Sequence, residues 1–215
     1  NVIICVSKSV KLKRFSRFGQ AMLKKIAVAY NGVDTVKFQA RNGFRKHVRA
    51  QLGVQSNDIF FGLVGNLIPR KAQNFFLKGL ASAREINPRF SAKTVIIGRD
   101  LDLNYTQTLH RLVSELNLHD CVVFQDFSEN IIDMLSALDI FVLSSKSEGF
   151  SRSLLEAMSV GLPVLATKID EIQEAVTDGE NALLVDYNNV NALAAAMLKL
   201  AEDEQLREKM GKANR

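Results

Sequence analysis

Short apolar runs alternate along the chain with stretches in which apolar residues recur at helical spacing. The runs are rich in Val, Ile and Phe and predict strands, whereas the amphipathic stretches predict helices. The predicted strands are 1–7, 26–30, 59–65, 93–98, 121–124, 139–145, 163–167 and 182–185. The predicted helices are 8–17, 43–52, 73–86, 104–117, 129–137, 151–160, 171–177, 190–202 and 204–213.

From residue 59 onward, strands and helices alternate, and the strands are too uniformly apolar for a sheet with one wet face. This order predicts an α/β fold, a Rossmann-like doubly wound parallel sheet with helices on both faces and right-handed crossovers. In such sheets ligands bind at the carboxyl ends of the strands, where loops lead into helices. The loops after the strands therefore hold the candidate chemistry.

The loop after strand 59–65 places two cations just before a helix. Gly65 ends the strand, and Arg70 and Lys71 follow in "GNLIPRKAQ". A helix N-terminus already favours negative charge, so cations beside it suit a bound phosphate. A solvated loop with two incidental charges is the alternative. The loop lacks P-loop spacing, and Gly98 lacks the companion glycines of a dinucleotide fingerprint.

The loop after strand 139–145 is polar and holds one of two glutamates eight residues apart, in "SSKSEGFSRSLLEAM". Gly149 allows a close backbone approach, and residues 151–154 offer the unpaired amides of a first helical turn. Glu156 points away from the apolar helix face, where a carboxylate can accept two hydroxyls of a ribose. Glu148 can do the same for a sugar. Ordinary acids near a helix start are the alternative, but the cationic loop favours a ligand with hydroxyls and phosphates.

Composition places the chain among soluble globular proteins, with 47% hydrophobic and 24% charged residues. No apolar run approaches the roughly 20 residues that span a bilayer. Cys5 and Cys121 stand alone within predicted strands, which favours buried free thiols in a reducing cytoplasm. The histidines His47, His110 and His119 show no metal-ligand spacing.

Charge is unevenly distributed along the chain. Residues 1–50 hold 12 Lys and Arg and one acid, a net charge of +11, whereas residues 51–215 hold 16 Lys and Arg and 22 acids, a net charge of −6. Such a basic segment can meet phosphates, nucleic acid or an anionic membrane, or it can be a solvated helix face. Nucleic acid is not expected, because no aromatic stacking surface accompanies the charge.

Several motifs in order resemble those of one enzyme family. "SSKSEGFSRSLLEAMSVGLPVLAT" resembles the Glu-x7-Glu signature of the retaining glycosyltransferases of family 4, the group 1 glycosyltransferases. "VGNLIPRKAQNFFLKGL" resembles their phosphate-binding loop, and "YNGVDTVKF" the segment that crosses between their two domains. "LHDCVVFQDFSENIIDMLSALDIFVLSS" and "EAVTDGENALLV" follow in the expected order.

The resemblance implies the C-terminal, donor-binding half of a two-domain GT-B enzyme, with no tightly bound metal and no other cofactor. It implies that Lys71 and Glu148 are catalytic, Lys71 on the diphosphate and Glu148 on the transferred sugar, and that Glu156 binds the ribose. The implied donor phosphate-binding residues are Asn66, Arg70, Lys71, Gly149, Phe150, Ser151, Ser153 and Leu154. The implied base-binding residues are Gln125, Asp126 and Phe127.

Three departures from the family pattern affect the implied site. Asn66 stands where arginine is common after the loop glycine. Asp170 and Glu171 stand where the family often has a Gly-Gly or Gly-Asp pair, and they would repel phosphate if they faced it. Gln125 and Asp126 replace the glycine that is usual in the loop of the base pocket.

We expect residues 1–34 to be the end of an N-terminal domain and the crossover, and residues 35–215 to be the nucleotide-sugar-binding domain. The acceptor-binding N-terminal domain is expected to lie outside this sequence, so the chain alone should transfer sugar poorly. The expected function is retaining transfer from a UDP- or GDP-sugar to a glycan or lipid-linked acceptor in polysaccharide, lipopolysaccharide or capsule synthesis. The expected location is cytoplasmic, with a peripheral contact at the inner membrane face. A nucleotide-sugar 2-epimerase-like enzyme and a non-catalytic nucleotide-binding domain are the alternatives.

Overall fold

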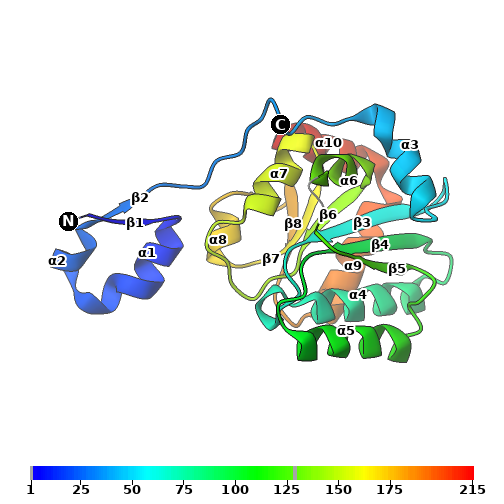
Figure 1. Ribbon diagram of the computed structural model, residues 1–215, viewed down its shortest axis with the longest axis horizontal. Coiled ribbons are helices and arrows are strands. Elements are labelled where there is room, and N and C mark those ends of the chain that lie inside the picture. The colour runs from blue at the N-terminus through cyan, green and yellow to red at the C-terminus, as the bar shows by residue number, and fades with distance from the viewer. Residues whose placement is uncertain (1, 128–129) are drawn as a thin grey trace.

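A six-stranded, fully parallel sheet forms the centre of the molecule in the computed structural model, which describes residues 2–127 and 130–215. The predicted doubly wound α/β fold is confirmed (Figure 1). In sheet order the strands are β5 (Val122–Gln125), β4 (Ala92–Ile97), β3 (Ile59–Val64), β6 (Ile140–Leu143), β7 (Val164–Thr167) and β8 (Ala182–Val185).

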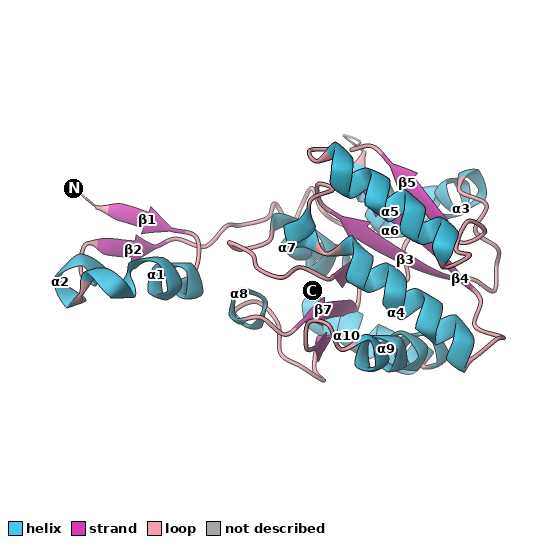
Figure 2. Cartoon of the chain, turned by 90° about the horizontal axis from the view of Figure 1, so that it is seen from below, coloured by secondary structure: helices cyan, strands magenta, loops and turns pink. Residues whose placement is uncertain are grey.

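Helices cover both faces of the sheet because successive strand residues point to opposite sides. Phe61 packs into one core and its neighbour Phe60 into the other, and both are fully buried. One face is covered by α4 (Gln73–Ile86), α5 (Leu103–Glu115) and α9 (Val190–Glu202), with α10 (Glu204–Asn214) along α9 (Figure 2). The other face is covered by α3 (Asn42–Gln51), α6 (Ile131–Ala137), α7 (Arg152–Val160) and α8 (Asp170–Gln173).

The chain changes direction across the sheet between β3 and β6. From β3 the strands proceed outward to β4 and β5, and from β6 they proceed the opposite way to β7 and β8. The loops that leave the carboxyl ends of β3 and β6 therefore diverge to opposite faces and leave a crevice between them. Both loops identified in the sequence start at this crevice.

A small separate unit, the N-terminal unit of residues 3–28, precedes the main body and is joined to it by an extended segment, residues 29–41 (Figures 1 and 2). It consists of β1 (Ile3–Cys5), α1 (Lys8–Phe15), a 3₁₀ turn (Ser16–Phe18), α2 (Gln20–Leu23) and β2 (Ile26–Val28). The two strands pair in parallel with each other in a sheet of their own. The predicted boundary between domains at residues 34 and 35 stays a prediction.

Element limits differ from the sequence prediction at a few places. The short α2 and the 3₁₀ turn Pro69–Lys71 were not predicted. The predicted helix 171–177 is only a single turn, Asp170–Gln173, and the amides of Ala175 and Val176 then both bond to the carbonyl of Ile172. Residue 1 of the first predicted strand and residue 129 of the predicted helix 129–137 lie outside the described residues.

No helix in the described part of the chain is long and apolar enough to cross a membrane. Cys5 and Cys121 are buried, as predicted, and burial raises the pKa of the Cys121 thiol to about 11. Among residues 2–127 and 130–215, no group of three or more His, Cys, Asp and Glu side chains is arranged to hold a metal ion.

Candidate nucleotide-sugar site

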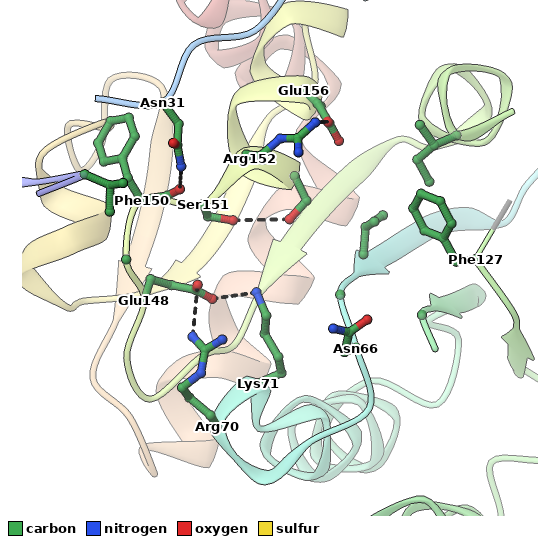
Figure 3. A pocket seen from close by; sticks show the side chains of 17 residues that line it. Asn31, Asn66, Arg70, Lys71, Phe127, Glu148, Phe150, Ser151, Arg152 and Glu156 are labelled. Atoms are coloured by element: carbon green, nitrogen blue, oxygen red, sulfur yellow. Dashed lines mark hydrogen bonds and ion pairs between the residues drawn. The ribbon is translucent and has the colours of Figure 1, made fainter. Parts of the chain in front are cut away.

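A cavity of about 480 Å³ opens at the crevice between the ends of β3 and β6 (Figure 3). Both predicted loops line it, together with residues from the N-terminal unit and the extended segment. The lining residues are Val6, Asn31, Val64, Gly65, Asn66, Arg70, Lys71, Gly98, Phe127, Ile131, Glu148, Gly149, Phe150, Ser151, Arg152, Ser153 and Glu156.

The cationic loop lies close against the end of β4. A Cβ atom on Gly98 would sit 2.1 Å from the Gly65 carbonyl oxygen, a distance that no side chain tolerates. Gly98 is therefore needed for the loop to cross the sheet edge, a role that the sequence did not reveal. The loop then forms the 3₁₀ turn Pro69–Lys71, which presents Arg70 and Lys71 to the cavity.

Glu148 is the centre of a polar cluster that joins the two loops (Figure 3). Its Oε1 accepts hydrogen bonds from Lys71 Nζ at 2.7 Å and from Ser145 Oγ at 2.5 Å. Arg70 lies 3.2 Å from its Oε2 and also donates to the Ser147 carbonyl at 2.7 Å. The structure thus brings the predicted phosphate-binding cations into contact with the predicted sugar-binding acid.

The Glu148 carboxylate is ionised although its side chain is only 5% exposed. Burial would raise its pKa, but the charge of Lys71, the hydrogen bonds from Lys71 and Ser145, and the charge of Arg70 together lower it below its usual value. The site therefore holds a buried carboxylate beside two cations that line the cavity.

The first turn of α7 faces the cavity, with one exception among the predicted residues. Ser151 caps the helix and accepts a hydrogen bond from the Leu154 amide. Leu154 is buried and does not line the cavity, and its amide is already bonded to the Ser151 hydroxyl. Phe150, Ser151 and Ser153 do line it.

Glu156 lines the cavity from one turn further along α7. Its side chain is 14% exposed, and its nearest cation is Arg152 at 3.9 Å. Burial raises the pKa of the carboxyl above its usual value, and the charges of Arg152 and Lys37 only partly offset that effect.

The three predicted base-binding residues are divided between two cavities. Phe127 lines the main cavity, and the guanidinium of Arg99 lies 5.6 Å from the centre of its ring. Gln125 and Asp126 line a neighbouring cavity of about 430 Å³ that shares Gly98 with the first. The amide oxygen of Gln125 is buried without a hydrogen-bond partner in the described part of the chain.

Two cavity residues that precede α3 in the chain, Val6 and Asn31, were missed in the sequence. Asn31 donates its side-chain amide to the Phe150 carbonyl at 2.7 Å, and Val6 lies against Gly149. The ring of Tyr30 packs on Phe150, with centroids 4.8 Å apart. Asn31 belongs to the "YNGVDTVKF" motif, so the motif that indicates the crossover also contains a cavity residue.

Asp170 and Glu171, the acids that depart from the family pattern, do not line the cavity. Lys13 of α1 lies 3.2 Å from Asp170 and 3.0 Å from Glu171. The repulsion of phosphate considered from the sequence therefore does not arise from these side chains in this arrangement. Asn66 does line the cavity, and its carbonyl accepts a hydrogen bond from Gln73.

Comparison with known proteins gives consistent matches. Residues 44–215 match the family model described as glycosyl transferases group 1. The chain is 29% identical to the D-inositol 3-phosphate glycosyltransferase of Streptomyces avermitilis over 92% of its own length. It is also 29% identical, over 85% of its length, to an Escherichia coli protein named UDP-Gal:alpha-D-GlcNAc-diphosphoundecaprenol alpha-1,3-galactosyltransferase. It covers 44% and 46% of these two relatives, so it spans about half the length of the curated proteins it matches.

Solved structures agree with the sequence relatives. The Anabaena protein Alr3699/HepE, crystallised with UDP and glucose, superposes with a TM-score of 0.90 at 26% identity over 99% of this chain and 56% of that one. The C-terminal domain of a group 1 family protein, LpcC from Francisella tularensis, matches with a TM-score of 0.73 at 26% identity over 85% of this chain and 94% of that domain.

Proposed function

The chain belongs to the glycosyl transferases group 1 family, and we propose on this basis that it is the donor-binding part of a retaining glycosyltransferase. Its substrate is a nucleotide sugar, a UDP- or GDP-sugar, bound in the cavity between β3 and β6. Residues 35–215 are the donor-binding domain, and residues 1–34 belong to the adjoining domain and crossover. The UDP and UDP-glucose complexes of the Anabaena neighbour support a uridine donor.

The contact between cations and acid across the two loops is the observation that carries this proposal. Lys71 and Arg70 bind the diphosphate and neutralise the charge that develops on it as it departs. Glu148 accepts hydroxyls of the transferred sugar, and Glu156 accepts those of the ribose. The protein binds its donor without a tightly held metal or another cofactor, since the two cations supply the positive charge.

The acceptor is a glycan or a lipid-linked glycan, and the pathway is the assembly of polysaccharide, lipopolysaccharide or capsule. The Escherichia coli relative, whose name contains a diphosphoundecaprenol, and a Rhizobium meliloti relative named for lipopolysaccharide core biosynthesis support this class. The basic N-terminal unit provides a peripheral contact with the membrane that carries such an acceptor.

Titration calorimetry with UDP, GDP, ADP, their sugars and the free nucleosides tests the donor site. We expect binding of one nucleoside diphosphate, and we expect Lys71→Ala to weaken it by about tenfold to a hundredfold while the free nucleoside binds unchanged. Lys78→Ala, an exposed lysine of α4 outside the cavity, is the matched control. Absence of any nucleotide binding at millimolar concentration would refute the donor site.

The same titrations and an assay for sugar conversion separate the alternatives. A non-catalytic nucleotide-binding domain would bind nucleotide but gain nothing from the attached sugar. An epimerase-like enzyme would convert a UDP-sugar to its 2-epimer without an acceptor, which nuclear magnetic resonance of the sugar detects.

A further inference from the structure

The lone pairs of the Glu148 carboxylate are almost fully used. Each carboxylate oxygen can accept about two hydrogen bonds. Oε1 accepts from both Ser145 and Lys71, and Oε2 accepts from Arg70. The three donors among the described side chains therefore occupy three of about four acceptor positions on Glu148 and leave about one for a ligand.

Two of these three donors are the cations assigned above to the diphosphate. Where Lys71 or Arg70 turns the N–H group that bonds Glu148 toward a phosphate oxygen, it releases an acceptor position on Glu148, which a hydroxyl of the sugar can then occupy. The exchange also removes hydrogen bonds that orient this buried carboxylate. Recognition of the sugar therefore requires a donor to Glu148 that does not move with the diphosphate.

The Ser145 side chain is more deeply buried than those of Arg70 and Lys71. It is fully buried, whereas the side chains of Arg70 and Lys71 are 45% and 14% exposed. Its carbonyl accepts a hydrogen bond of 2.5 Å from the hydroxyl of Thr167 on β7, which is itself buried. Ser145 lies two residues beyond the end of β6 and does not line the cavity, so its hydroxyl is held from inside the protein.

We propose that Ser145 is a positioning residue for recognition of the donor sugar. Its hydroxyl holds the Glu148 carboxylate in the orientation that accepts sugar hydroxyls while Lys71 and Arg70 bind the diphosphate. The inference rests on the proposed function of the same cavity. It adds that Ser145 contributes to binding of the sugar and leaves binding of the nucleotide diphosphate unchanged.

The test compares the affinity of the nucleotide sugar with that of the matching nucleotide. The probes are UDP, UDP-glucose, UDP-galactose, GDP and GDP-mannose. The affinity ratio is the affinity for the nucleotide sugar that the wild-type chain binds most tightly, divided by the affinity for the nucleotide without its sugar. Ser145→Ala should lower this ratio about tenfold, the loss of one hydrogen bond to a charged group, with the affinity for the nucleotide unchanged. An unchanged ratio, or equal losses for both ligands, would overturn the proposal.

Ser144→Ala is the matched control for loss of a buried hydroxyl. Ser144 is also buried at the end of β6, but its hydroxyl donates to the Lys71 carbonyl at 3.0 Å instead of to the carboxylate. This variant should therefore change the affinities of nucleotide and nucleotide sugar together. If Ser145→Ala lowers the thermal midpoint, Ser145→Cys serves in its place, because a thiol keeps the shape but donates weakly.

A double-mutant cycle shows whether Ser145 acts through Glu148. In a Glu148→Gln background, Ser145→Ala should leave the affinity ratio unchanged, because the carboxylate that it positions is gone.

The pH dependence of the affinity ratio gives a second readout. Ser145→Ala removes a bond that favours the ionised form of Glu148, which faces Lys71 and Arg70 from the opposite loop, so the ratio should begin to fall at a higher pH than in the wild type. Additive losses in the cycle, together with an unchanged pH profile, would contradict the proposal; absence of nucleotide binding by the wild type would instead refute the proposed function.

Discussion

The pKa values of the two glutamates in the cavity, Glu148 and Glu156, shift in opposite directions, because two cations lie close to Glu148 only. Burial raises the pKa of both carboxyls, but Lys71, Ser145 and Arg70 lower that of Glu148 by more. Glu156 has Arg152 at 3.9 Å as its nearest cation, and its pKa is raised. The two acids therefore respond differently to pH at the scale of single residues.

Binding of a free nucleoside should weaken in mildly acidic solution. Glu156 must be ionised to accept two ribose hydroxyls, and its raised pKa means that it takes up a proton at a higher pH than an ordinary glutamate. The affinity for uridine or guanosine should therefore be constant near neutral pH and fall as the pH drops through that raised value.

Calorimetry across a pH series measures this dependence, and Glu156→Gln should bind the nucleoside weakly with a flat profile. A wild-type profile as flat as that of the glutamine variant would exclude the ribose role.

At the scale of elements, α8 and the turn after it form the charged contact between the main body and α1. Glu174 accepts hydrogen bonds from the amides of Lys8 at 2.9 Å and Ser9 at 2.7 Å and from the Tyr30 hydroxyl at 2.7 Å. Burial would raise its pKa, but these bonds and that from the Ser9 hydroxyl lower it to about 2. Tyr30 also packs on Phe150, so the contact extends to the wall of the cavity.

The stabilisation from Glu174 has a definite sign with pH. Its pKa is lower in the folded protein than in the unfolded chain, so its contribution is complete above the ordinary glutamate value and is lost as the pH falls through about 2. Glu174 therefore contributes its full stabilisation to the contact with α1 near neutral pH.

Glu174→Ala should loosen the N-terminal unit from the main body. Cleavage within the extended segment, residues 29–41, should then become about tenfold faster in limited proteolysis, because several hydrogen bonds are lost and cleavage follows the open population. Glu180→Ala, an exposed glutamate beyond this contact, is the control. Equal cleavage rates for the two variants would show that Glu174 does not hold the unit.

At the scale of the whole molecule, the basic charge is concentrated where apolar side chains are exposed. The N-terminal unit, residues 3–28, holds seven Lys and Arg and no acid, and within it Leu12 and Phe18 are 56% and 55% exposed. Cations beside exposed apolar residues suit the surface of an anionic bilayer. The main body, in which residues 51–215 have a net charge of −6, carries most of the cavity lining, and Val6 and Asn31 add to it from the N-terminal side.

The chain should bind vesicles of phosphatidylcholine and phosphatidylglycerol and not vesicles of phosphatidylcholine alone. Raising the salt from about 0.1 M to about 0.5 M should weaken this binding by roughly tenfold or more, because the charges are exposed and screened. Lys24→Glu with Lys25→Glu should weaken it in sedimentation assays. The same charge change at Lys209 and Lys212, on α10, should have little effect, and equal losses in both pairs would indicate attraction by net charge alone.

The sequence by itself determined the elements from residue 59 onward and the two loops of the site. Uniformly apolar runs and helical spacing are local properties, so they predicted the doubly wound sheet, and the strand ends predicted where Lys71 and Glu148 would lie. The motif resemblance indicated the same loops and the family.

Only the tertiary structure decided which side chains meet. Lys71 and Glu148 are 77 residues apart, Asn31 and Phe150 are 119 apart, and Lys13 and Glu171 are 158 apart. The sequence could not show that Glu171 faces Lys13 instead of phosphate, that Gly98 must lack a Cβ beside Gly65, or that Ser145 reaches Glu148. These contacts depend on the order of the strands and on the direction in which each loop leaves the sheet, and the pattern of neighbouring residues contains neither.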